Sequence, residues 1–327
     1  MTEPLQPERV LRDRYVIRRV IGRGGMGSIY LAEDNRLPGR LCALKEVHQE
    51  NSLPEPIRAE GREQFYREAS VLARLDQPNL PKVSDFFSES DRDYLVMDYV
   101  PGEDLKTLVD RARRESRFLP QDEVLNWARQ LSDALAYLHG LDPPVIHRDI
   151  KPSNVKLTPT GVLKLVDFGL VKQMAPDEMT VTVIQGRGTA QYTPLEQYGG
   201  DIGHTDPRSD IYAFGATLYH LLTGIPPVDA KQRFLRPSAL RPLRELNPVI
   251  SASVERSILW AMALHPDERP SDILAFRRAL LSEPPQGQSP PGRATLSPSA
   301  IPLSPVDRTL AAVAALLFLL ALFATVR

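Results

Sequence analysis

Two short runs of residues near the middle of this 327-residue chain constrain its fold more than any other feature. Residues 147–154 read HRDIKPSN, and a run that reads DFG begins at Asp167 after a short apolar stretch. The first run supplies a carboxylate at Asp149, a cation at Lys151 and an amide oxygen at Asn154. One carboxylate for a hydroxyl, one cation for a moving phosphoryl group and two oxygen ligands for a metal suit phosphoryl transfer.

A glycine-rich run lies upstream of these motifs. Residues 21–30 read IGRGGMGSIY, with Gly22, Gly24 and Gly27 at the spacing GxGxxG. Glycines let the backbone approach phosphate groups closely and present N–H donors to them. Such a run is by itself most often only a turn. It gains weight from Lys45, which follows on a predicted apolar strand.

The predicted secondary structure divides the chain into a strand-rich part and a helical part. Short apolar runs predict strands at 16–21, 28–32, 41–47 and 94–97, and apolar residues at helical spacing predict helices around 65–75, 124–138 and 211–222. We therefore expect an α+β fold, with most strands in the first third of the chain and helices dominating after it.

Taken in this order, the motifs resemble those of Hanks-type (eukaryotic-like) serine/threonine protein kinases, as found in bacteria. The resemblance implies a two-lobed kinase domain at 15–281. A β-rich N-lobe would span 15–97, a hinge 98–102 and a helical C-lobe 103–281. It further implies transfer of the γ-phosphoryl group of ATP to serine or threonine hydroxyls of cytosolic proteins, with Mg²⁺ or alternatively Mn²⁺ as the metal.

The resemblance also implies a role for each residue of the catalytic run. Asp149 would accept or orient the substrate hydroxyl, and Lys151 would neutralise charge on the γ-phosphoryl group. Asn154 and Asp167 would hold Mg²⁺ through oxygen atoms. His147 would be structural and is left out of catalysis.

Lys45 would contact the α- and β-phosphates and pair with a helix glutamate. Glu68 is our candidate, because it lies one turn before an apolar residue on the same predicted helix. Glu60 and Glu63 compete for this role, although Glu63 falls roughly 140° away around the helix.

The residues around the base follow from the same resemblance. Met97 would close the back of the adenine pocket, and the backbone from Asp98 to Val100 would bond the base. Ile29 and Ala43 would cover one face of it. The full nucleotide set is Ile21, Gly22, Gly24, Gly27, Ile29, Ala43, Lys45, Met97, Asp98, Val100 and Lys156.

Lys156 departs from the family pattern, which has an apolar residue two positions after the asparagine of the catalytic run. Its methylene stem can still cover the base while the ammonium reaches outward. A weakened nucleotide site is the other interpretation. It would favour a membrane-tethered pseudokinase that binds ATP and acts as a signalling scaffold. A small-molecule kinase of similar fold is a third, less favoured interpretation.

Regulation would involve the segment after Asp167. Arg148 precedes the catalytic aspartate, and kinases with that arginine commonly need a phosphate on this loop. We expect autophosphorylation at Thr180 or Thr182, although both can equally be ordinary loop residues. Thr189 resembles the threonine that reaches the catalytic aspartate in serine/threonine kinases.

Three further residues are expected to be structural. By resemblance, Glu196 would pair with Arg269 and hold the end of the loop segment. Asp210 opens an apolar helix, and we expect it to help hold the catalytic loop through N-cap bonding.

The ends of the chain differ in character from its middle. Residues 1–14 are polar and predict a flexible N-terminus, and residues 282–308 are rich in proline and serine and predict a disordered linker. Residues 309–326 are almost wholly apolar and predict one transmembrane helix, because the seventeen uncharged residues from Leu310 to Val326 span roughly 25 Å as a helix. A buried core helix is the less favoured alternative. The kinase domain would then lie on the cytoplasmic side of the membrane.

Composition excludes several classes of protein. A net charge of −1 offers no global field that would attract nucleic acid. Cys42 is the only cysteine, so an intramolecular disulfide is impossible. The expected partners are protein substrates, ATP and a lipid bilayer. Phosphorylation in trans would in addition bring two copies of the chain together transiently as a homodimer.

Overall fold

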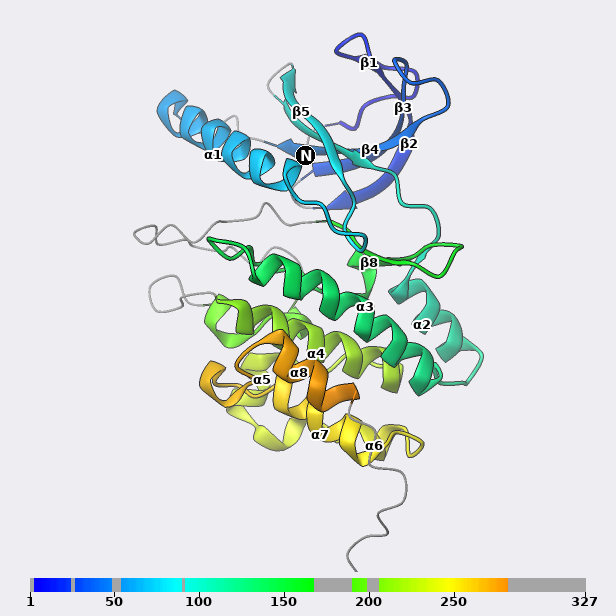
Figure 1. Ribbon diagram of the computed structural model, residues 1–327, viewed down its shortest axis with the longest axis vertical. Coiled ribbons are helices and arrows are strands. Elements are labelled where there is room, and N and C mark those ends of the chain that lie inside the picture. Colours follow the sequence, from blue (N-terminus) through cyan, green and yellow to red (C-terminus); the bar gives the residue numbers. More distant parts are fainter. Residues whose placement is uncertain are drawn as a thin grey trace, which may run out of the picture. The chain divides into compact units, whose positions relative to one another are not determined.

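A computed structural model describes residues 3–24, 27–48, 54–89, 92–167, 190–198 and 206–281 (Figure 1). The chain divides into one unit at Met1–Ser282 and another at Glu283–Arg327. The predicted linker at 282–308 and the predicted transmembrane helix at 309–326 lie outside the described residues. Among the helices that the structure describes, none combines the length and the apolar character needed to cross a membrane.

The strand-rich part of the described chain forms a six-stranded antiparallel sheet with the order β1-β2-β3-β4-β6-β5. Its strands are β1 (Val10–Leu11), β2 (Tyr15–Gly24), β3 (Gly27–Asp34), β4 (Leu41–His48), β5 (Val83–Glu89) and β6 (Arg92–Asp98). In this register Lys45 lies opposite Ile29 on one side and Leu95 on the other. The central strand β4 therefore fixes where the Lys45 side chain leaves the sheet.

Both faces of this sheet are buried. Helix α1 (Glu55–Ala73) contacts β5 and β6 and contributes Phe65 and Leu72 to one hydrophobic cluster (Figure 1). The other face forms a second cluster in which the rings of Tyr15 and Phe87 stack at 5.8 Å. Side chains alternate between the two faces of a strand, which explains why a strand such as β6 is buried at almost every position.

The prediction that residues 1–14 form a flexible N-terminus was wrong for the part that the structure describes. Leu11 is buried and lies opposite Tyr15 in the β1–β2 pairing. The backbone N–H of Leu5 donates to the hydroxyl of Tyr30 at 3.0 Å. Burial of the apolar side chains among polar neighbours stabilises this segment against the sheet.

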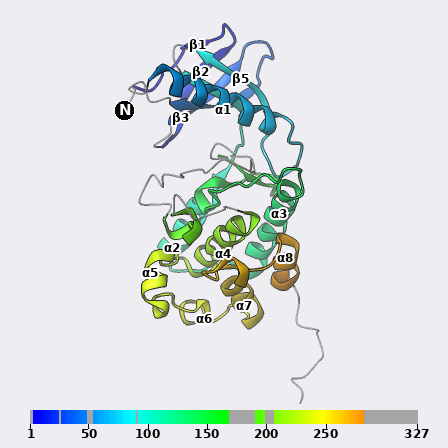
Figure 2. The ribbon, with the colours of Figure 1, turned by 90° about the vertical axis from the view of Figure 1, so that its left-hand side faces the viewer.

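The helical part surrounds α4. Its helices are α2 (Leu105–Arg114), α3 (Gln121–His139), α4 (Pro207–Thr223), α5 (Ala230–Leu235), α6 (Leu243–Leu246), α7 (Ala252–Ala261) and α8 (Ile273–Leu281). Figure 2 shows α4 in the middle of the other helices, and it contacts α2, α3, α6, α7 and α8. Because its residues from Ser209 onward are buried, α4 is the fixed element against which the site is built.

Helix α4 begins at a residue that the sequence analysis did not choose. The side chain of Asp206 accepts from the backbone N–H of Arg208 at 2.7 Å, and Pro207 occupies the first helical position. Asp210, expected at the N-cap, lies one turn further inside the helix and is fully buried. The N-cap prediction for Asp210 was therefore wrong.

A small sheet carries the catalytic run. It consists of β7 (Glu103–Asp104), β8 (Val155–Leu157) and β9 (Leu163–Leu165) in that order. The buried Asn79 joins this sheet to the loop between α1 and β5, since its side chain donates to the carbonyl of Leu163 at 2.7 Å. Its own carbonyl accepts from Leu165 at 2.8 Å, so the two parts of the fold are tied together here.

Candidate active site

One buried carboxylate, that of Asp210, holds the backbone of the catalytic run at residues 147–154 in place. Asp210 accepts hydrogen bonds from the backbone N–H groups of His147 and Arg148, each at 2.8 Å, and from the His139 ring at 2.9 Å. Burial alone would raise the pKa of Asp210, but its hydrogen bond with His139 and nearby positive charge outweigh burial and lower it. Asp210 therefore stays ionised and fixes the path of the loop, through its position inside α4.

Two residues of the site adopt backbone conformations that are unfavourable for side chains other than glycine. The φ angles are 65° at Arg148 and 60° at Asp167. Each such residue costs on the order of 1–3 kcal/mol and persists only where its surroundings fix it. The hydrogen bond from Arg148 to Asp210 is one such constraint.

Asp149 lies at the centre of a polar cluster. Its Oδ2 accepts from Lys151 Nζ at 2.7 Å and from Asn154 Nδ2 at 2.8 Å. Asn154 Nδ2 also reaches the Asp149 carbonyl at 2.9 Å. Asp149 Oδ1 is buried and accepts no hydrogen bond in the described part of the chain. Because an unsatisfied buried acceptor costs free energy, this oxygen would gain from the hydrogen bond of an incoming hydroxyl.

Asp167 lies beside this cluster because of a backbone contact. The N–H of Val166 donates to the Asn154 carbonyl at 2.8 Å, which holds the backbone just before Asp167 against Asn154. Lys45 on β4 donates a hydrogen bond to the Asp167 carboxylate. Burial would raise the pKa of Asp167, but the charge and hydrogen bond of Lys45 outweigh it and keep the pKa below its ordinary value.

Lys45 forms an ion pair with Asp167. Its expected pairing with Glu68 stays a prediction. Glu68 is nevertheless buried on α1, where it accepts from Gln64 Nε2 at 3.0 Å. Glu60 and Glu63, the competing candidates, are exposed.

The other nucleotide-set residues lie on neighbouring strands. Ile29 on β3 is opposite Lys45, and Ala43 on β4 is opposite Met97 on β6. Gly27 opens β3 with a φ of 141°, a conformation that favours glycine. Ile21, Gly22 and Gly24 belong to β2, Asp98 ends β6 and Val100 follows it, and Lys156 lies on β8. Residues 25 and 26, in the turn between β2 and β3, lie outside the described residues.

Comparison with known proteins identifies the fold that carries this site. The family model described as protein kinase domain matches residues 15–281. The chain belongs to the protein kinase family. Its curated relatives place it among the Hanks-type serine/threonine kinases of bacteria.

Two relatives illustrate the extent of the similarity. The chain is 35% identical to the DNA damage-responsive serine/threonine-protein kinase RqkA of Deinococcus radiodurans, over 89% of this chain and 44% of RqkA. It is 34% identical to the serine/threonine-protein kinase PknA of Mycobacterium tuberculosis, over 92% of this chain and 69% of PknA. The chain therefore spans less than half the length of RqkA and about two thirds of that of PknA.

A solved structure agrees with the fold. The crystal structure of the PknI kinase domain of Mycobacterium tuberculosis matches with a TM-score of 0.64 at 29% identity. The match covers 85% of this chain and 98% of that chain. The two-lobed kinase fold, with its β-rich N-lobe and helical C-lobe, is thereby established for the described part of the chain.

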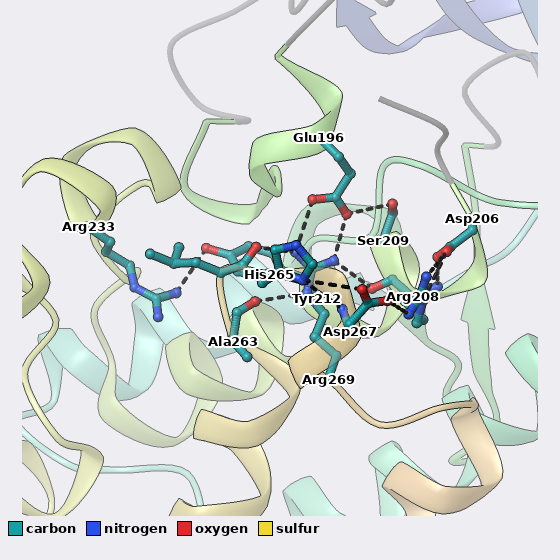
Figure 3. A network of polar contacts seen from close by, with 11 residues as sticks. Glu196, Asp206, Arg208, Ser209, Tyr212, Arg233, Ala263, His265, Asp267 and Arg269 are labelled. Atoms are coloured by element: carbon teal, nitrogen blue, oxygen red, sulfur yellow. Dashed lines mark hydrogen bonds and ion pairs between the residues drawn. The ribbon is translucent and has the colours of Figure 1, made fainter. Parts of the chain in front are cut away.

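An ion pair between Glu196 and Arg269 anchors the chain at 190–198, where the segment that follows Asp167 ends (Figure 3). Their two contacts measure 2.6 and 3.0 Å, and Ser209 donates to the same carboxylate at 2.8 Å. The Arg269 side chain has no solvent exposure and also donates to the carbonyl of Ala263. This bidentate geometry is the strong form of an arginine–carboxylate contact.

The expected regulatory threonines cannot be placed beside these residues. Thr180, Thr182 and Thr189 all lie outside the described residues. Arg148 is described and half-buried. Burial lowers the pKa of its guanidinium, whereas the charges of Asp210 and Glu68 act in the opposite direction.

Sequence reasoning missed two contributions by histidine. His139 donates to Asp210 from the end of α3, and His220 on α4 lies 2.7 Å from the Tyr192 hydroxyl. Burial lowers the pKa of His220 to about 4, so its ring stays neutral. The signal for His139 was its position on the last turn of a predicted helix, just before the catalytic run.

Proposed function

We propose that this protein is an ATP-dependent protein serine/threonine kinase that phosphorylates serine and threonine residues of cytosolic proteins. The observation that carries the proposal is the cluster in which Lys151 and Asn154 both donate to one oxygen of Asp149, while the other, buried oxygen accepts no hydrogen bond from the described residues. A carboxylate oriented in this way can accept the hydrogen bond of an incoming hydroxyl. The family membership and the names of the curated relatives support the same reaction.

The mechanism assigns one task to each side chain. Asp149 orients the substrate hydroxyl through the oxygen that has no other partner among the described residues, and Lys151, already 2.7 Å from Asp149, lies close enough to stabilise negative charge on the transferred group. Asn154 and Asp167 offer the oxygen ligands that Mg²⁺ prefers, and Lys45 supplies a buried ammonium for the nucleotide phosphates. When bound, the metal neutralises charge on the phosphate oxygens.

A pseudokinase is the weaker alternative. Each position that the reaction needs holds a chemically competent residue, and Lys156 is the one departure from the family pattern in the nucleotide set. The contacts among Asp149, Lys151 and Asn154 favour the enzyme, since a scaffold would not need this arrangement.

The C-terminal segment supports a membrane location in the proposal. Residues 310–326 contain no charged side chain, and they follow a proline- and serine-rich stretch. We infer a single-pass helix at 309–326 with the kinase domain on the cytoplasmic side, where ATP is available. Washing isolated membranes with alkaline carbonate tests this: the full chain should stay in the pellet, whereas a chain ending at residue 308 should be released. Release of both proteins would contradict the anchor.

The activity itself is tested by phosphosite mapping. The full chain, purified in detergent, is incubated with MgATP and analysed by mass spectrometry, with Asp149→Asn and Lys45→Met as controls. We expect phosphate on Thr180 or Thr182 in the wild type and none in either variant. Phosphate at other positions alone would retain the kinase and remove the proposed loop regulation. Bound ATP without any phosphate transfer would support the pseudokinase.

A further inference from the structure

Ser116, just after α2, adopts a backbone conformation that usually belongs to glycine. Its φ angle is 53°. Its N–H donates to the carbonyl of Arg113 at 3.0 Å, and the N–H of Arg117 donates to the carbonyl of Ala112 at 3.0 Å. These two hydrogen bonds form the Schellman motif, in which the left-handed position is most often glycine and sometimes asparagine. The chain thus carries a hydroxyl group where glycine would be less strained.

This hydroxyl lies in an accessible part of the chain. Residues 113–118 are all exposed, and even the large apolar side chain of Phe118 is 44% exposed. Helix α2 ends at Arg114 and α3 begins at Gln121, so the residues between them belong to neither helix. A second protein can therefore reach Ser116 without unfolding a helix.

Three arginines lie within three positions of Ser116. Arg113 and Arg114 form no ion pair among the described residues, and Arg117 Nε contacts the Glu115 carboxylate at 2.5 Å. The hydrogen bond from Arg117 lowers the pKa of Glu115, and the charges of the neighbouring arginines lower it further. The turn therefore carries more positive than negative charge and stabilises an anion beside it.

We propose that Ser116 is a phosphorylation site, that a second copy of this chain phosphorylates it, and that the three neighbouring arginines bind the resulting phosphate. This inference rests on the proposed function. The dipole of α2 opposes negative charge at its C-terminal end, but charge-assisted hydrogen bonds from several guanidinium groups are the stronger effect. The phosphate would compete with Glu115 for Arg117 and offset the excess positive charge of the turn.

The transfer balances with ATP as the only other reactant. The Oγ of Ser116 forms a bond to the γ-phosphorus, the bond from that phosphorus to the β–γ bridging oxygen breaks, and ADP leaves. Asp149 of the second copy accepts the hydroxyl proton.

The fold favours transfer between two copies rather than within one. The start of α2 is joined to the small sheet through the pairing of Asp104 with Lys156, two positions after Asn154. Ser116 follows the opposite end of this ten-residue helix, roughly 15 Å further along its axis. The two hydrogen bonds of the Schellman motif hold Ser116 in that place.

Mixing two forms of the full chain in detergent tests the site. The acceptor is Asp149→Asn labelled with ¹⁵N, so that mass spectrometry separates its peptides from those of the unlabelled wild-type enzyme. After incubation with MgATP we expect phosphate on Ser116 of the labelled acceptor. Ser271 is the matched control, because it is exposed but donates to the Asp272 carboxylate at 2.9 Å, and it should stay unmodified.

The outcomes separate the inference from the proposed function. An acceptor that also carries Ser116→Gly keeps the backbone conformation and should lose only that phosphate. Phosphate on other residues of the acceptor, with none on Ser116, would overturn the inference and leave the kinase in place. Absence of phosphate from both proteins would refute the kinase, and the inference with it.

The role of the arginines has a readout of its own. The second pKa of a phosphoserine is ordinarily about 6, and nearby guanidinium groups lower it because they favour the doubly charged form. Titration by ³¹P NMR follows the resonance that Ser116→Gly removes. Replacing Arg113 and Arg114 with glutamine should make this phosphate up to about tenfold less acidic. Arg67→Gln, which removes an exposed arginine on α1, should change nothing. Equal acidity in all three proteins would overturn phosphate binding by the arginines.

Discussion

The ammonium of Lys45 on β4 contacts the carboxylate of Asp167, which lies 122 positions further along the chain. This ion pair joins the central strand of the sheet to the residue that follows β9. In the proposed mechanism the same two side chains serve the nucleotide phosphates and the metal. Binding of MgATP must therefore compete with the contact between Lys45 and Asp167. Replacing either side chain with a neutral one should lower the rate of phosphoryl transfer.

Replacing Lys45 with methionine should abolish most phosphoryl transfer. The change removes a buried positive charge that stabilises phosphate, and losses of about 10²–10³-fold are typical for such preorganised groups. Initial rates of phosphate incorporation from radiolabelled ATP give the measurement. Lys106→Met, which removes an exposed lysine on α2 paired with Asp110, serves as the matched control. A rate within twofold of wild type for Lys45→Met would contradict the assignment.

Asp149→Asn should lose transfer while it retains nucleotide binding. The amide matches the carboxylate in shape, but it cannot provide the negative charge that orients the hydroxyl and accepts from Lys151. We expect a decrease in rate of about 10²–10⁴-fold. Thermal stabilisation by MgATP, compared between variant and wild type, reports binding separately. Loss of that stabilisation would mean that Asp149 holds the nucleotide rather than the substrate.

Asp210→Asn should lower the free energy of unfolding by about 1–3 kcal/mol, because an amide leaves part of a buried set of three donors without an acceptor. The pKa of Asp210 is lowered from 3.8 in the folded protein. Its contribution is therefore present above about pH 4 and declines as the pH falls through the folded-state pKa. Urea unfolding at several pH values should show the variant and wild type converging in acid.

The control for that experiment is Asp206→Asn, the same chemical change four residues earlier in the same helix. Asparagine is an equally good N-cap, and the ion pair that Asp206 forms with Arg208 is partly exposed, so this variant should unfold within about 1 kcal/mol of the wild type. A constant difference between Asp210→Asn and wild type down to strongly acid pH would show that the carboxylate charge contributes nothing.

Arg269→Met should destabilise the helical lobe by about 3–5 kcal/mol, because it removes the buried guanidinium and leaves the Glu196 carboxylate without its charged partner. Arg277→Met provides the comparison, because Arg277 forms a partly exposed ion pair with Asp133 that should contribute no more than about 1 kcal/mol. Midpoints of urea unfolding distinguish the two. Similar midpoints for both variants would place the Glu196 contact among the weak surface pairs.

Sequence reasoning predicted the fold well where residue types and spacing determine local structure. The apolar strand around Lys45 and the buried face of α1 with Glu68 both follow from periodicity alone. The choice among Glu60, Glu63 and Glu68 could be made because only one of the three lies on the buried face. These features depend on near neighbours in the chain.

Other features depend on contacts between distant segments and were not predictable from local patterns. The ion pair between Lys45 and Asp167, for example, joins residues 122 positions apart and was not expected from the sequence, whereas the pairing of Lys45 with Glu68 stays a prediction. The start of α4 was misplaced by one turn, although Pro207 marked the first helical position and could have corrected it. The chain departs from the family pattern at Lys156, but only the structure places its ammonium beside Tyr99.

The paired β1 strand has a practical consequence for anyone who shortens this protein. The family match begins at residue 15, yet Leu11 packs under the sheet and Arg14 forms a bidentate contact with Asp34 at 2.8 and 2.7 Å. Cutting at the homology boundary would strip away one edge strand and leave an aromatic surface around Tyr15 open to water. The folded domain therefore begins before residue 15, where the family match begins, and the segment that contains β1 belongs to it.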